Sequence, residues 1–177
     1  IYTDNNHIWP FWYSVGQHEH GYDFLAWSQA NGHGVLCGSP RSEGLMISNL
    51  FVYGKFAIFK ATADIYGWMT NVGGDRCENG LIIDSTPADD SFTICNFGNI
   101  GRSDLGGTGY ALTISGATAN VRWIGGYIRL HGTNKVLKTT TTSEVDVTGV
   151  KGYNPVGNIT APSVPATTVA YANPYAH

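Results

Sequence analysis

The sequence predicts an all-β protein in which parallel strands are stacked as a coil, and three observations support this prediction. Charged residues make up only 13% of the 177 residues, whereas 23 residues are glycine, a composition that disfavours a helical bundle. Hydrophobic residues make up 42%, which is enough to bury a core and argues against disorder. The third observation is a sequence repeat that occurs five times between residues 33 and 155.

Each copy of the repeat contains a short pattern of an apolar residue, a spacer, an asparagine or glycine, and a second apolar residue. The five patterns are Ile47–Leu50, Met69–Val72, Ile94–Phe97, Ile124–Tyr127 and Val147–Val150. Their third positions are Asn49, Asn71, Asn96, Gly126 and Gly149. Because asparagine and glycine accept a left-handed backbone at low cost, we expect the chain to turn a corner at each of these positions.

A second apolar stretch precedes each pattern, and a turn of small and polar residues separates the two. These stretches begin at Val35, Ala57, Leu81, Ala111 and Val136. A strand, a turn, a second strand, a corner and a third strand would return the chain to its start, so that successive levels pair in parallel about 4.8 Å apart. Stacked levels bury a continuous apolar column that one level cannot bury alone. The expected interior stacks are Ile47, Met69, Ile94, Ile124 and Val147 in one, and Leu50, Val72, Phe97, Tyr127 and Val150 in the other.

The repeat resembles the right-handed parallel β-helix of pectate-lyase-like proteins and phage tailspikes. The resemblance implies a single-stranded β-helix of about five rungs over residues 33–155, in which Asn49, Asn71 and Asn96 stack as a corner ladder of bonded amides. A leucine-rich solenoid is the rival, but the sequence has no leucine-rich consensus. Residues 1–32 are then an N-terminal aromatic segment and cap. Residues 156–177 are an extended C-terminal tail like that of secreted or viral β-helix proteins.

Both ends of the chain lie outside the expected repeat. An apolar aromatic run contains Ile8, Trp9, Phe11, Trp12 and Tyr13, and residues 17–30 are expected to form a short helix over the first rung. The tail stops before the closing strand that the resemblance implies. Because a coil leaves strand edges and an apolar cross-section at each end, we expect self-association through the ends. The first residue is Ile1, so we expect a processed product or a fragment.

Carboxylates on the outer wall are the candidates for chemistry. If the protein is an enzyme, Asp75, Glu78, Asp84 and Asp104 are the expected catalytic residues, because a glycosidase needs two carboxyl groups roughly 5 to 10 Å apart. The alternatives are a solvated ion network or a Ca2+ site, and no other cofactor is expected.

Two further residue sets invite metal-site interpretations. His18 and His20 form an HxH pair that could bind a metal, with surface polarity as the alternative reading. The three cysteines, Cys37, Cys77 and Cys95, match no CxxC zinc pattern. We expect them to be small buried hydrophobic residues, with one disulfide bridge at most.

Exposed aromatic rings are the candidates for binding sugar, because a ring face covers the apolar C–H surface of a sugar. Trp68 and Trp123 each precede an expected interior residue, so alternation along a strand predicts that both face outward. The alternative is that they fill a subunit contact.

Composition and motifs exclude several other classes. The net charge of −3 gives no basic footprint for nucleic acid, and no apolar run approaches the length of a membrane-spanning helix. No phosphate loop, Ser-His-Asp spacing or zinc-protease motif occurs. We therefore expect a non-catalytic structural module of an extracellular or virion-surface fibre or filament, which contacts itself and polysaccharide. The alternatives are a tailspike-like glycoside hydrolase or polysaccharide lyase, and a carbohydrate-binding module.

Overall fold

The protein is almost entirely β structure in a computed structural model. The structure describes residues 2–8, 21–38, 41–84, 91–101, 109–115, 119–129, 136–138 and 143–153. The elements are β1 (Tyr2–Ile8), α2 (Gly21–Asn31), β2 (His33–Cys37), β3 (Ser42–Tyr53), β4 (Ala57–Ala61), β5 (Ile65–Cys77), β6 (Asn79–Ile83), β7 (Ser91–Gly101), β8 (Leu112–Ile114), β9 (Asn120–Arg129), β10 (Val136–Lys138) and β11 (Glu144–Thr148).

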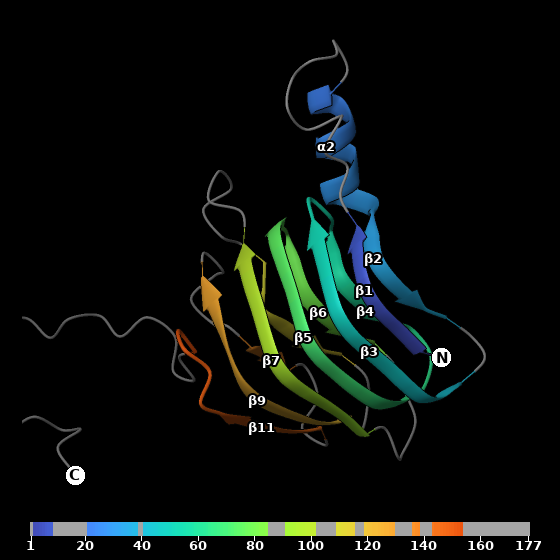
Figure 1. The fold of residues 1–177 in the computed structure, drawn as a ribbon, viewed down its shortest axis with the longest axis vertical. Coiled ribbons are helices and arrows are strands. Elements are labelled where there is room, and N and C mark those ends of the chain that lie inside the picture. The colour runs from blue at the N-terminus through green and yellow to red at the C-terminus, as the bar shows by residue number, and fades with distance from the viewer. Residues whose placement is uncertain are drawn as a thin grey trace, which may run out of the picture.

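The strands form two sheets. The long sheet has the order β1-β3-β5-β7-β9-β11, and the short sheet has the order β10-β8-β6-β4-β2. Every strand pair is parallel. From β2 onward a short strand is followed by a long one, so each turn of the chain adds one strand to each sheet (Figure 1). The predicted fold class is confirmed: the protein is a parallel β-solenoid.

A left-handed corner at an asparagine bends β3, β5 and β7. Asn49, Asn71 and Asn96 have φ angles of 50°, 52° and 52°, where asparagine is tolerated better than most residues. The Nδ2 of Asn71 donates to the Oδ1 of Asn49 at 3.3 Å, and the Nδ2 of Asn96 donates to the Oδ1 of Asn71 at 2.8 Å. These residues form the amide ladder that the sequence predicts.

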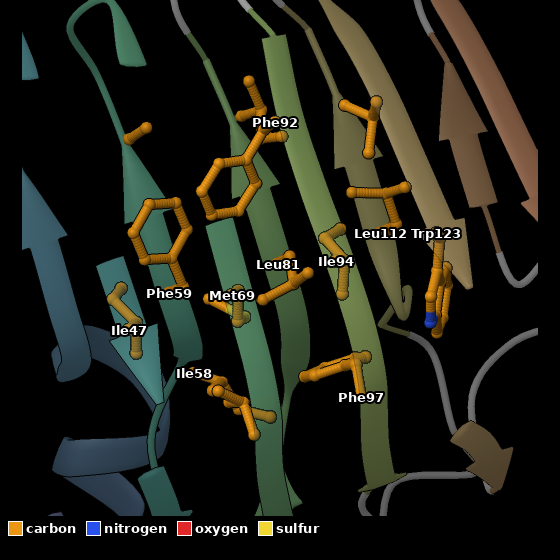
Figure 2. Close-up of a cluster of buried hydrophobic side chains, with 14 of the residues drawn as sticks. Ile47, Ile58, Phe59, Met69, Leu81, Phe92, Ile94, Phe97, Leu112 and Trp123 are labelled. Atoms are coloured by element: carbon orange, nitrogen blue, oxygen red, sulfur yellow. The ribbon is translucent and has the colours of Figure 1, made fainter. Parts of the chain in front are cut away.

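The core lies between the two sheets. Ile47, Met69 and Ile94 from the long sheet are at most 1% exposed. Phe59 of the short sheet stacks on Phe92 of the long sheet with ring centroids 5.4 Å apart (Figure 2). Burying one such side chain contributes about 1.5–3 kcal/mol, so the column of apolar side chains is the main source of stability.

The expected register of the fourth copy is wrong by one residue. Gly125, not Gly126, lies level with the asparagine corners, since Cys95 pairs with Ile124 and Phe97 pairs with Gly126. A one-residue slip moves each side chain to the opposite face of a strand. Trp123 is therefore fully buried, whereas Ile124 and Tyr127 are 36% and 42% exposed.

Packing around Phe97 explains this register. Gly126 occupies the interior row of Leu50, Val72 and Phe97, and a Cβ there would collide with the carbonyl oxygen of Phe97. The indole of Trp123 packs edge-on against the Phe97 ring at 5.4 Å instead. Its Nε1 donates to the carbonyl of Gly125 at 3.1 Å, which satisfies the only polar atom of the buried ring.

The N-terminal segment also departs from expectation. Residues 2–8 do not lie outside the repeat: they form β1, which pairs in register with β3 from Tyr2–Met46 to Ile8–Val52. Asn6 pairs with Leu50 of the interior row, but it is polar and exposed, so the apolar pattern is lost there.

The helix α2 stands beyond the ends of the long strands rather than over the first level of the coil (Figure 1). The Nε2 of its Gln29 donates to the carbonyl of Arg76 at 2.9 Å, and the carbonyl of Ser28 accepts from the backbone N–H of Phe56. Strand β1, not the helix, covers the edge of β3.

Candidate functional site

The structure does not bring all the candidate carboxylates together. Asp75 lies near the end of β5 and Glu78 immediately follows that strand, so both occupy the same corner. Asp84 follows β6 at the opposite corner, where its Oδ1 accepts a hydrogen bond from the Ser115 hydroxyl at 2.8 Å. The five residues of β6 place about 16 Å between these corners. Asp104 lies outside the described residues.

The candidate metal ligands and the cysteines give no centre in the described part of the chain. His18 and His20 lie outside it, and no group of three metal-binding side chains occurs among the described residues. All three cysteines are free thiols, and Cys37 and Cys77 are buried as expected. Burial raises the pKa of the Cys77 thiol to about 12, so this thiol is protonated and unreactive near neutral pH.

A row of outward-facing residues crosses the long sheet before the corner. Met46 pairs with Trp68, and Trp68 pairs with Thr93. Thr93 in turn pairs with Arg122, and Arg122 pairs with Asp146, so the five residues form one continuous ladder. We call these the outer row: Met46, Trp68, Thr93, Arg122 and Asp146. Four strand spacings of about 4.8 Å give it a length of roughly 19 Å.

One end of the outer row is aromatic. Trp68 and Met46 are each 47% exposed and Tyr66 is 44% exposed. The rings of Tyr66 and Trp68 pack edge to face with centroids 5.7 Å apart, a geometry that holds both rings in place. The expected outward position of Trp68 is thus observed, whereas that of Trp123 is wrong because its ring lies inside the core.

The other end of the outer row is polar and hollowed. A recess of about 350 Å3 is lined by Thr93, Asn120, Val121, Arg122, Glu144 and Asp146. The Nε of Arg122 lies 3.7 Å from the Oδ2 of Asp146, and both side chains are about two-thirds exposed. Such an exposed pair adds little stability, so both groups remain able to hydrogen-bond a ligand.

Sequence reasoning identified Trp68 and missed Met46, Tyr66 and Arg122. The signal was present for two of them, because Met46 precedes interior Ile47 just as Trp68 precedes Met69, and Tyr66 lies on the same face two residues earlier. Arg122 needed the corrected register of β9. Of the residues expected to mediate self-association, Ile8 is partly buried against the core. The other four, Trp9, Phe11, Trp12 and Tyr13, lie outside the described residues.

In the part of the chain that the structure describes, no helix has the length and apolar character needed to cross a membrane. The chain matches no family model, no curated protein and no solved structure.

Proposed function

We propose that the chain is a non-catalytic structural module of an extracellular or virion-surface fibre, and that its outer row contacts polysaccharide. The observation that carries this proposal is the exposed Tyr66–Trp68 pair, which continues into hydrogen-bonding groups along the outer row. A flat aromatic face beside fixed polar groups suits a pyranose, whose C–H face is apolar and whose rim carries hydroxyls.

The fibre part of the proposal rests on the two ends of the coil. Strands β1 and β11 each have one partner in the long sheet among the described residues, and an unpaired strand edge favours pairing with another chain. In the last turn Val147 and Val150 are only partly buried, so apolar surface accompanies that edge. We further propose that the solenoid is of the right-handed type found in pectate-lyase-like and tailspike proteins.

The arrangement of the carboxylates sets Asp84 apart, and among the described candidates only Asp75 and Glu78 share a corner. Asp84 is separated from Asp75 and Glu78 by the length of β6, which exceeds the roughly 5 to 10 Å at which two carboxyl groups hydrolyse a glycosidic bond. A tailspike-like glycosidase or lyase is the alternative that the experiment below must exclude.

The test compares Trp68→Ala with Trp27→Ala, since Trp27 is 59% exposed on α2 and lies off the outer row. We expect Trp68→Ala to weaken binding on a glycan array about tenfold, equivalent to about 1.4 kcal/mol, while Trp27→Ala leaves binding unchanged. Equal effects of both variants, or no glycan bound by the intact chain, would contradict the polysaccharide contact.

Two further readouts test the rest of the proposal. Release of reducing ends from any bound polysaccharide would replace the structural role with the enzyme. Electron microscopy of the native material that shows only separate single chains at high concentration would contradict the fibre.

A further inference from the structure

The amide ladder stops at Asn96 with its next place open. Each ladder Oδ1 accepts from the asparagine on the following strand, as Asn49 does from Asn71 and Asn71 does from Asn96. On β9 the equivalent position is Gly125, which has φ 67° and no atom within 4 Å of where a Cβ would lie. The Oδ1 of Asn96 therefore has no ladder amide on β9 from which to accept a hydrogen bond.

A recess of about 840 Å3 lies at this ladder end, lined by Asn96, Gly126, Tyr127, Ile128, Arg129, Lys151 and Gly152. Tyr127 and Arg129 alternate outward around buried Ile128. Lys151 forms a parallel bridge to Tyr127, so both cations neighbour this tyrosine on the outer surface.

The Tyr127 ring has a fixed position in this recess. It leans over Gly98, where a Cβ would come within 2.6 to 3.2 Å of three ring atoms. Gly98 thus leaves the space that the ring occupies, and the ring remains 42% exposed.

The charge of the recess is positive. Its described lining includes Arg129 and Lys151 and no carboxylate. Among the described residues, neither cation forms an ion pair, whereas Arg122 on the same strand does. Two cations without an ion-pair partner among the described residues, beside one ring, suit a ligand that carries a carboxylate.

We propose that the ladder end binds an acidic saccharide, a pyranose that carries a carboxylate. The carboxylate lies against Arg129 and Lys151, the C–H face of the sugar covers Tyr127, and a hydroxyl donates to the Oδ1 of Asn96 in the place of the next ladder amide. A neutral sugar would leave both cations unused, and a simple anion would leave the ring and the amide unused. The ligand belongs to the class proposed above, but the site uses no residue of the outer row.

The decisive variant is Gly125→Asn. Asparagine is tolerated at this φ, as the three corners show, and its Nδ2 can donate to the Oδ1 of Asn96, which extends the ladder and fills the sugar's place. One added ladder bond contributes about 0.5 kcal/mol, so the variant should melt about 1–2 °C higher than the parent chain while binding the acidic sugar at least tenfold more weakly. A loss of binding with a gain in stability cannot be attributed to misfolding.

The probes are hexamers of mannuronate and of galacturonate, and cellohexaose is the neutral control. Each is titrated into the protein by calorimetry, with EDTA present so that Ca2+ cannot bridge carboxylates. The intact chain should bind one of the acidic hexamers at least tenfold more tightly than cellohexaose. Arg129→Gln and Lys151→Gln should each weaken that binding and reduce its salt dependence. Trp68→Ala should leave it unchanged.

Three results would overturn the proposal: no preference for either acidic hexamer, unchanged binding by Gly125→Asn, or equally tight binding of acetate, which would show a simple anion site. Sensitivity to Trp68→Ala but not to Gly125→Asn would place the sugar on the outer row alone. Sensitivity to Gly125→Asn but not to Trp68→Ala would support the ladder-end site and count against the outer row.

Discussion

The strands with asparagine corners, β3, β5 and β7, differ from those with glycine corners, β9 and β11. All five corners are left-handed, with φ of 50° to 52° at the asparagines and 66° to 67° at Gly125 and Gly149. Only the first three are joined by side-chain hydrogen bonds. The fold thus requires the backbone conformation at every corner, whereas the amide ladder is an additional stabilising contact.

The two regions also differ in how their cores are closed. In the asparagine-cornered strands the interior positions are at most 2% exposed, whereas Val145, Val147 and Val150 of the last turn are only partly buried. The glycine-cornered β9 is closed like the asparagine-cornered strands, since Val121 and Ile128 are each 3% exposed. Among the described residues, the largest fully buried side chain of the core is Trp123 on this strand. It joins the two regions through its contact with Phe97.

The largest expected effect comes from removing that joining residue. Trp123→Ala should lower the free energy of unfolding by about 3–5 kcal/mol, the usual cost of deleting a buried aromatic ring. Trp68→Ala, its exposed counterpart, should change it by less than about 0.5 kcal/mol. Urea denaturation of both variants measures the difference, and similar costs would show that the register of β9 described above is incorrect.

A matched pair of valines compares core closure directly. Val72 and Val150 occupy the same interior row, but Val72 is 1% exposed and Val150 only partly buried. Val72→Ala should cost about 2 kcal/mol, from about 0.8 kcal/mol per buried methyl-sized group plus the cavity left behind, and Val150→Ala about half as much. Equal costs in chemical denaturation would mean that the last turn is as well covered as the middle of the coil.

The smallest expected effect concerns the corners themselves. Asn71→Gly keeps the left-handed backbone but removes both ladder bonds, which should cost about 1 kcal/mol because each exposed bond contributes little. Gly149→Asn should have almost no effect, since its neighbour Gly125 carries no amide to bond. If Asn71→Gly and Gly149→Asn shifted the melting temperature equally and in the same direction, the ladder would not be a stabilising feature.

The sequence predicted the repeat well where its chemistry was unambiguous. Ile47, Met69 and Ile94 each stand two residues before an asparagine, and only one alignment satisfies all three. At Trp123-Ile124-Gly125-Gly126 two adjacent glycines fit the corner equally well, and the choice between them decides which aromatic ring is buried. The steric conflict between a side chain at position 126 and the Phe97 carbonyl settles that choice, and it is a contact between strands that no local pattern contains.

The candidate sites were less predictable for a related reason. Trp68 follows from alternation alone, but the outer row depends on which residues pair across five strands. The one-residue error in the predicted register placed Tyr127 in the core and Trp123 on the surface, the reverse of what the structure has. Lys151 belongs to the turn after the last repeat, and only its bridge to Tyr127 brings it to the ladder end.

The pairing order of the long sheet has a consequence for how the chain folds. Each inner strand of this sheet hydrogen-bonds only to the long strand before it and the long strand after it in the sequence, so cooperativity passes between nearest neighbours. A nucleus of β3 and β5 can therefore form while β9 and β11 are still being synthesised, because its pairing requires nothing from later turns. Each new turn can then pair with the exposed edge of the last, so the strand order permits the coil to grow in the direction in which the ribosome delivers the chain.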